Sequence, residues 1–236
     1  RGLGDVYKRQ YEITVNQVKN PKGNICGFAS VVFEDCFKAG NIAIVKNKAG
    51  ELFVSMPRYE SSKEQDEYQD ICHPITKEFR ESLCENILKS FAELERTGEK
   101  HYHFGEAQTK ELAFNVAVTP YEREGSSLRG LARIYLEDCF VINQVTLVEG
   151  RNGIFVSMPS YKTNRVDQHG KPVYRDICYP VTAKFRENLY DRIQSAYEEA
   201  KEKRQEQSER KQETDEPQHG DCLLYTSPSP RDPKTS

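Results

Sequence analysis

Residues 53–57 read Phe-Val-Ser-Met-Pro, and the same five letters return at residues 155–159. Phenylalanine and valine favour a strand, and proline lacks the backbone amide that would extend the pairing of that strand. We therefore interpret FVSMP as the end of a strand and not as a functional site. Because a string this unusual rarely recurs by chance, it marks a repeat whose extent can be traced outward.

Three further blocks recur in the same order around FVSMP. Residues 34–37 (EDCF) return at 137–140, residues 70–76 (DICHPIT) return as DICYPVT at 176–182, and residues 79–81 (FRE) return at 185–187. A period of about 100 residues indicates two whole domains and not a solenoid of small units. The repeat predicts a first domain over 11–98, a linker over 99–110, a second domain over 111–200 and a charged tail over 201–221.

Each copy changes from a strand pattern to a helix pattern. Short runs at 13–18, 28–33, 42–45 and 52–56 are rich in β-branched and aromatic residues and are separated by turn residues. Apolar residues then follow at helical spacing, with Thr76 as a candidate N-cap and Gly98 as a candidate stop. The apolar stripes consist of Phe79, Leu83, Ile87, Phe91 and Leu94 in copy one and of Phe185, Leu189, Ile193 and Tyr197 in copy two. The expected fold class is α+β: two tandem small domains, each an antiparallel β-sheet meander followed by a C-terminal α-helix.

The two ends of the chain do not fit this repeat. Residues 5–10 read DVYKRQ and residues 222–227 read CLLYTS. One short DNA element, read in opposite directions, can encode both strings, and it resembles the mosaic-end adapter of transposon-based sequencing libraries. We expect residues 1–10 and 222–236 to be adapter-derived scars and leave them out of the fold argument.

The composition predicts a polar protein that is located in the cytoplasm. The chain is 36% hydrophobic and 30% charged, with a mean hydropathy of -0.78, and it contains no apolar run near the roughly 20 residues of a membrane span. Its net charge of -3 means that any surface for a polyanion must be local. The cysteines of the repeats form no CxxC pair, which favours buried thiols over disulfides or zinc ligands.

Two residue pairs suggest chemistry, and in each case a structural role is favoured. Cys72 and His73 could form a nucleophile and base, but copy two has Cys178 and Tyr179, and adjacent strand residues face opposite ways. The pair His101 and His103 could bind a metal but lacks a third ligand. Since the sequence also shows no glycine-rich phosphate loop or serine elbow, we expect no enzyme, no cofactor and no metal site.

The run over 140–160, FVINQVTLVEGRNGIFVSMPS, followed by YRDICYPV at 174–181, resembles the SpoVG family of stage V sporulation and septation regulators. The resemblance covers nearly all of each repeat, although copy one departs more and has Gln69 where copy two has Arg175. The resemblance implies that this chain is a regulator that binds DNA or RNA, and that its domains pair with each other through the edges of their sheets. Two copies in one chain then supply an internal partner at roughly millimolar effective concentration.

The loop after FVSMP differs in charge between the copies. Residues 160–175 carry four cations and one anion, a net +3, whereas residues 58–69 carry two cations and four anions, a net -2. Cations interleaved with tyrosines suit phosphate contact and base stacking. Together with the resemblance, this pattern predicts a nucleic-acid surface formed by Tyr161, Lys162, Arg165, Lys171, Tyr174 and Arg175.

We therefore expect a nucleic-acid-binding regulator whose two repeats pair within the chain. The predicted partners are DNA, RNA or both, with further homodimerisation left open and no membrane partner. The alternative is a protein-interaction or scaffolding module that acts through exposed sheet edges and binds no nucleic acid.

Overall fold

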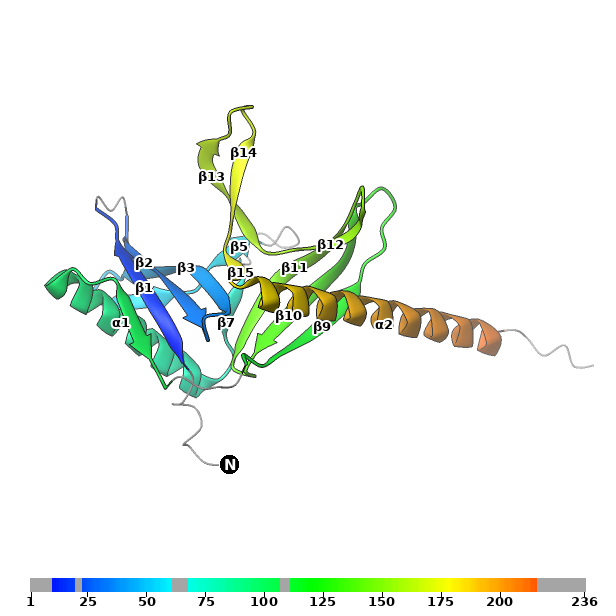
Figure 1. The fold of residues 1–236 in the computed structure, drawn as a ribbon, viewed down its shortest axis with the longest axis horizontal. Helices are drawn as coiled ribbons and strands as arrows, with labels where there is room; N and C mark the ends of the chain where they lie inside the picture. Colours follow the sequence, from blue (N-terminus) through cyan, green and yellow to red (C-terminus); the bar gives the residue numbers. More distant parts are fainter. Residues whose placement is uncertain (1–9, 20–22, 61–67, 107–110, 216–236) are drawn as a thin grey trace, which may run out of the picture. The chain divides into compact units, whose positions relative to one another are not determined.

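The structure is a computed structural model that describes residues 10–19, 23–60, 68–106 and 111–215 (Figure 1). The elements of copy one, in chain order, are β1 (Tyr11–Gln17), β2 (Ile25–Phe33), β3 (Phe37–Lys46), β4 (Leu52–Ser55), β5 (Arg58–Glu60), β6 (Tyr68–Asp70), β7 (Cys72–Pro74), α1 (Lys77–Thr97) and β8 (His101–Phe104). Those of copy two are β9 (Phe114–Pro120), β10 (Leu128–Leu136), β11 (Phe140–Gly150), β12 (Gly153–Ser157), β13 (Ser160–Val166), β14 (Pro172–Asp176), β15 (Cys178–Pro180) and α2 (Ala183–Asp215).

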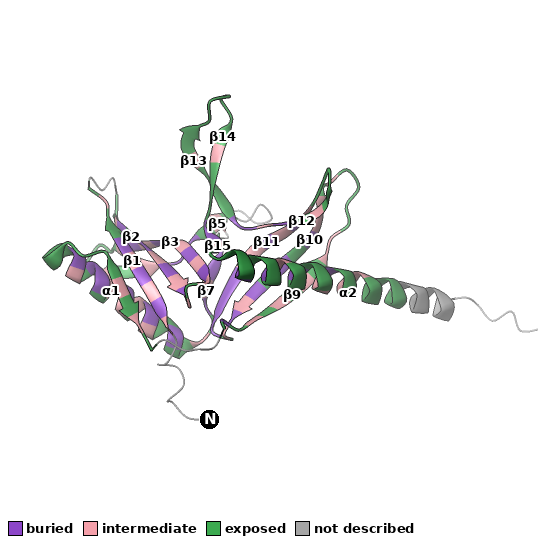
Figure 2. Cartoon of the chain, viewed as in Figure 1, coloured by how far each residue is buried: buried purple, intermediate pink, exposed green. Residues whose placement is uncertain are grey.

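The predicted fold class is confirmed in both copies. Strands β1 to β4 form an antiparallel meander, strands β9 to β12 form a second one, and a helix follows each. Alternate residues of β1 and β2, such as Ile13 and Val31, are fully buried, while their neighbours are partly exposed (Figure 2). This period of two is the signature of a sheet with one covered face.

The two helices cover those faces through the predicted apolar stripes. All nine stripe residues are buried: Phe79, Leu83, Ile87, Phe91, Leu94, Phe185, Leu189, Ile193 and Tyr197. Helix α1 begins at the predicted cap, where the Thr76 hydroxyl accepts a hydrogen bond from the Phe79 amide at 3.3 Å. It ends at Gly98, whose φ of 79° is left-handed and whose amide donates to the Leu94 carbonyl. Glycine tolerates that backbone conformation because it has no Cβ.

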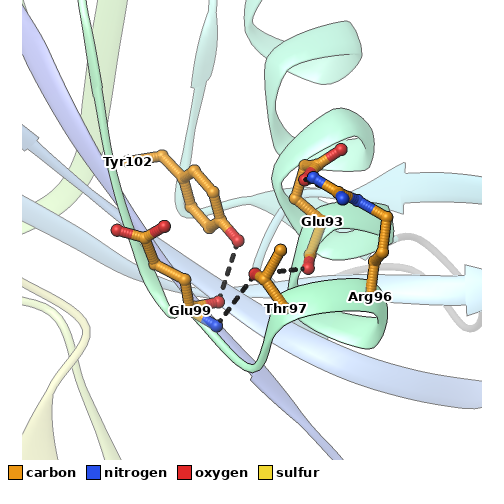
Figure 3. Close-up of polar contacts among 5 residues, drawn as sticks. All are labelled: Glu93, Arg96, Thr97, Glu99 and Tyr102. Carbon is orange, nitrogen blue, oxygen red and sulfur yellow. Dashed lines mark hydrogen bonds and ion pairs between the residues drawn. The ribbon is translucent and has the colours of Figure 1, made fainter.

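Hydrogen bonds at the end of α1 fix the turn that leads the chain to the next strand of the sheet (Figure 3). The Thr97 hydroxyl donates to the Glu93 carbonyl and accepts from the Glu99 amide, and the Tyr102 hydroxyl donates to the Glu99 carbonyl. The chain then forms β8, which pairs with β1 and stacks Phe104 on Tyr11. The range expected to be a linker therefore contains a strand that covers the edge of sheet one.

The repeated Glu-Asp pairs make the tight turns between β2 and β3 and between β10 and β11. Glu34, Asp35, Glu137 and Asp138 all have positive φ between 44° and 53°, as type I′ hairpin turns require at both central positions. Each glutamate also accepts a hydrogen bond from the backbone before the first strand, Glu137 from Ala113 and Glu34 from Gln10. Gln10 thus contacts the first domain, whereas residues 1–9 and 222–236, assigned to scars, lie outside the described residues.

The two copies exchange short strands. β7 of copy one pairs antiparallel with the start of β11 in copy two, and β15 of copy two pairs in the same way with the start of β3. The remaining length of β3 pairs with β4, and that of β11 with β12. Along one edge, β3 and β11 each pair first with a strand of the other copy and then with a strand of their own copy.

A bulge separates the two halves of each shared edge. Asn41 and Gln144 have positive φ, 55° and 60°, and the register with the neighbouring strand shifts close to both residues. At the same places the Gly40 amide donates to the Ile177 carbonyl at 2.8 Å, and the Asn143 amide donates to the Ile71 carbonyl at 2.7 Å. These two bonds join the bulge of each central strand to the backbone of the other copy, at the place where the strand changes partner.

The buried side chains of both copies form one hydrophobic cluster. The Phe33 ring of copy one lies 5.0 Å from the Phe140 ring of copy two, and the Phe37 ring lies 6.4 Å from that of Phe185. Both copies belong to a single compact unit that ends at Lys201. Beyond it, α2 continues to Asp215 within the range expected to be a charged tail.

Because the copies share a core, replacing Phe140 with Ala should destabilise both of them. Phe140 is fully buried and faces Pro74 of β7 across the exchanged pair, and such a truncation costs about 3–5 kcal/mol. Urea unfolding followed by circular dichroism measures this loss. The matched control is Phe155→Ala at a half-exposed position of β12, where we expect about 1 kcal/mol or less. Two unfolding transitions of which only one shifts in the Phe140→Ala variant would contradict a shared core.

Candidate nucleic-acid interface

The predicted basic loop is a β-hairpin, which we call arm 2 (residues 160–176). Strands β13 and β14 pair with each other and with no other strand of the described chain. Gly170 has a left-handed φ of 74°, and the Asp167 carboxylate accepts the amides of His169 and Lys171 at 2.8 Å each. The prediction of a loop was wrong, because arm 2 is exposed along both strands and its sequence therefore lacks the regular alternation of apolar and polar residues.

The hairpin places the six predicted site residues on two faces. Tyr161 lies opposite Arg175, and Lys162 lies opposite Tyr174. Directly opposed residues of an antiparallel pair project from the same face, and the next pair projects from the other face. Each face of arm 2 therefore presents one tyrosine and one cation. Arg165 and Lys171 lie nearer the tip, and all six side chains are exposed.

The four cations of arm 2 are not neutralised by neighbours. Within the described ranges, no carboxylate forms an ion pair with Lys162, Arg165, Lys171 or Arg175. The single acid between β13 and β14, Asp167, already accepts two amides of its own turn. Arm 2 thus keeps its positive charge available to an external anion.

The equivalent hairpin of copy one, arm 1, consists of β5 and β6. Its Arg58 pairs with Asp70 at 3.0 Å, and the Tyr59 hydroxyl donates to Gln69. Gln69 occupies the place that Arg175 has in arm 2, and it lies opposite Tyr59. Glu60 lies opposite Tyr68 in the same hairpin. The remaining charged residues of the predicted acidic loop, Lys63, Glu64, Asp66 and Glu67, lie outside the described residues.

The Met-Pro pair of the repeated string forms the base of each arm. Met56 and Met158 are buried, while the carbonyls of Pro57 and Pro159 accept the amides of Ile71 and Ile177 at 2.8 Å. The proline ends the preceding strand, and its carbonyl closes the hairpin. The string FVSMP therefore explains where the arms leave the sheet.

A groove lies between arm 2 and the outer face of sheet one, and we call it groove A. It has a volume of about 490 Å³ and is lined by Phe28, Asn41, Ala43, Ser55, Met56, Pro57, Arg58, Tyr68, Tyr161 and Ile177. Of these residues, sequence reasoning placed only Tyr161 at a site. Phe28 carried a signal that was missed, because Ala29, Val31 and Phe33 set the buried phase of β2 and leave Phe28 on the outer face.

A second groove, groove B, lies between arm 1 and the outer face of sheet two. It is larger, about 700 Å³, and Leu131 and Gln144 line it at the positions that Phe28 and Asn41 occupy in copy one. Its other lining residues are Arg58, Tyr59, Tyr68, Gln69, Asp70, His73, Ala117, Thr119, Ala132, Arg133 and Asn143. The two grooves have equivalent positions in the repeat but different chemistry.

The remaining candidate residues do not gather into a reactive site. Cys72 is fully buried, and its hydrogen bond with Cys178, together with burial, raises the pKa of its thiol well above the ordinary value. The cysteines of the two copies form no disulfide in the described chain. Cys72, Cys139 and Cys178 are buried as expected, whereas Cys26, Cys36 and Cys84 are partly exposed. His101 contacts Thr14 and Glu12, and no group of three metal-ligating side chains occurs in the described part of the chain.

The comparison with known families decides the relationship. The family model described as SpoVG matches residues 9–93 and 113–199. The chain belongs to the SpoVG family. It is similar to the protein named "Putative septation protein SpoVG" of Phytoplasma australiense, with 40% identity over 74 residues that make up 31% of this chain and 71% of the relative.

Two further relatives carry the same name. The SpoVG protein of Treponema denticola is 35% identical over 74 residues, 31% of this chain and 73% of its own. That of Clostridioides difficile is 34% identical over 86 residues, 36% of this chain and 86% of its own. An aligned stretch of this length corresponds to one copy of the repeat, so the chain contains two SpoVG domains. Neither α1 nor α2 contains an apolar stretch of the length that a membrane-spanning helix requires.

His73 in groove B should make stability depend on pH. Burial lowers the pKa of its imidazole below 6.5, and its Nδ1 has no hydrogen-bond partner among the described residues. The imidazole of the unfolded chain then binds a proton at a higher pH than that of the folded chain. The free energy of unfolding is therefore unaffected by His73 above about pH 6.5 and falls as the pH drops below that value. The substitution His73→Tyr introduces the residue that copy two has at this position. It should remove the part of the acid destabilisation that His73 causes, as measured by urea unfolding at a series of pH values.

The control for this substitution is Tyr179→Phe at the equivalent position of copy two, which should keep the parent's pH profile. A His73→Tyr profile that also matches the parent's below pH 6.5 would show that His73 is not the responsible group.

Proposed function

We propose that this SpoVG-family protein is a nucleic-acid-binding regulator and that arm 2 is its main contact surface. The observation that carries the proposal is the set of four cations on one exposed hairpin without an ion-pair partner in the described chain. Most affinity for nucleic acid comes from phosphate contacts of this kind. The names of the relatives connect the family with septation, and we propose that the regulated process is septation or sporulation in the bacterial cytoplasm.

The geometry of arm 2 suits a polyanion in two ways. A hairpin that stands away from the sheets (Figure 1) can reach phosphates without clashes between the rest of the protein and the nucleic acid. Its pairing of a tyrosine with a cation on each face joins a stacking surface to a phosphate contact. Arm 1 lacks this arrangement, because its tyrosines lie opposite Gln69 and Glu60 in place of cations. Its one described cation, Arg58, is neutralised by Asp70.

A scaffolding function is the second candidate, and one edge strand favours it. β9 is the last strand of sheet two, and β10 is the one strand of the described chain that pairs with it, whereas β8 covers the equivalent edge of sheet one. An open edge can accept a strand from another protein. Binding through β9 would depend little on salt, whereas binding through arm 2 would depend on it strongly.

Replacing Lys162, Arg165, Lys171 and Arg175 with Gln should weaken binding to nucleic acid sharply. Each lost phosphate contact lowers the slope of log affinity against log salt by roughly 0.7 to 0.9, so the slope should flatten by as much as about 3. Fluorescence anisotropy with labelled DNA and RNA over a salt series measures both quantities. The control replaces Lys46, Lys48, Lys77 and Lys89 with Gln, which changes the net charge equally.

Similar losses in the two variants would show that net charge and not arm 2 governs binding. A parent protein that retains neither DNA nor RNA at low salt would favour the scaffolding function instead.

We also infer that the internal strand exchange replaces the partner chain that a single SpoVG domain requires. Solution scattering on residues 11–221 should then give one compact monomeric particle, because the exchanged strands hold both copies in one core. A profile of two bodies moving independently would contradict the exchange, and a concentration-dependent mass of twice the chain would show a further homodimer.

A further inference from the structure

We propose that groove A binds an unpaired base of a single-stranded nucleic acid whose backbone follows arm 2. This inference rests on the proposed function and makes it more specific, because it names the substrate class. It predicts a preference for single strands over duplexes, which the charge of arm 2 alone does not.

Three exposed aromatic rings converge on groove A from three separate segments. Phe28 of β2 is 40% exposed, Tyr68 of β6 is 60% exposed and Tyr161 of β13 is 36% exposed. The ring contacts found in the described chain join other aromatic residues and leave these three without a ring partner. Open aromatic faces at the edge of a basic surface are the groups on which nucleic-acid bases stack.

The polar residues of groove A suit the edge of a base. Asn41 lines the groove from the bulge of β3, and its amide makes no hydrogen bond with any described residue, so both its donor and its acceptor are available. No carboxylate is among the residues that line groove A. Arg58, which lines the groove, is paired with Asp70.

Arm 2 connects the groove to the phosphates. Arg175 lies directly opposite Tyr161, and opposed residues of an antiparallel pair share a face. The face of arm 2 that contributes Tyr161 to groove A therefore also carries a cation without an ion-pair partner in the described chain. A base on Phe28 and Tyr161 would place its own backbone within reach of that guanidinium.

Groove B provides an internal comparison at equivalent positions of the repeat. It has Leu131 in place of Phe28, and its Tyr59 lies opposite the neutral Gln69. Arg58 and Arg133 line groove B, but Asp70, which pairs with Arg58, and His73 with its buried Nδ1 line it as well. The combination of a sheet aromatic, an arm tyrosine and an opposed cation occurs in groove A and not in groove B.

A duplex cannot offer the group that groove A fits. In an undistorted double helix both faces of each base are covered by stacked neighbours, so a base is open to stacking on a side chain only where it is unpaired. Duplex DNA would therefore contact the cations of arm 2 and leave groove A empty. The difference in affinity between single strand and duplex therefore measures the contribution of groove A separately from that of the arm 2 cations.

The test combines a protein substitution with removal of bases. Phe28→Leu introduces the residue that copy two has at this position, and the control is Leu131→Ala in groove B. Four labelled probes of equal length are compared: single-stranded DNA, the matching single-stranded RNA, the DNA duplex, and single-stranded DNA with internal abasic sites that keeps every phosphate. Circular dichroism melting checks that both variants remain folded.

We expect Phe28→Leu to weaken both base-containing single strands by about fivefold or more, since stacking contributes at least roughly 1 kcal/mol per base. The variant should bind the abasic strand and the duplex as the parent does, and Leu131→Ala should bind all four probes as the parent does. The loss of affinity should be equal for single-stranded DNA and RNA, because the Phe28 ring contacts the base and not the sugar.

Equal loss on the base-containing and abasic strands would assign Phe28 a purely structural role and overturn the inference. A parent that binds duplex as tightly as single strand would overturn it as well. In both cases the proposed function stands if the arm 2 cation variant still flattens the salt slope, and it fails together with the inference if the parent retains no probe.

Discussion

Backbone hydrogen bonds between the two copies are the constraint on which the rest of this structure depends. The first residues of β3 and β11 would be open sheet edges in an isolated domain, and the exchanged strands β15 and β7 occupy them. Unpaired amides and carbonyls at a buried edge are costly, so each copy stabilises the other. The bulges at Asn41 and Gln144 allow one strand to serve two partners in succession.

The exchange also determines where the arms lie. Each arm is the segment between a strand that stays in its own sheet and a strand that crosses to the other sheet, so it emerges at the junction of the two copies. The prolines at 57 and 159 close the arm bases, and the arm of one copy faces the outer sheet surface of the other copy. Grooves A and B are a direct consequence of this arrangement.

Duplication within one chain permits a difference that a symmetric dimer cannot have. In a homodimer, every substitution appears twice, so both arms and both grooves carry the same residues. Here arm 1 contains an internal ion pair between Arg58 and Asp70, whereas the cations of arm 2 have no such partner in the described chain. One groove has Phe28 and the other Leu131. The two halves can therefore specialise while the shared core stays nearly symmetric.

The sequence by itself determined the elements and their buried faces. The apolar spacing in α1 and α2, the cap at Thr76, the stop at Gly98 and the strands of each meander all follow from side-chain periodicity and local backbone preference, and the structure confirms them. The residues of arm 2 were also found from their charge. Only the tertiary structure decided which strands exchange, that β8 covers β1, that arm 2 is a hairpin, and that Phe28 and Tyr68 join Tyr161 in one groove. The physical reason is that edge pairing uses backbone groups, which are the same in every residue except proline, so periodicity shows which face is buried but not which edge meets which.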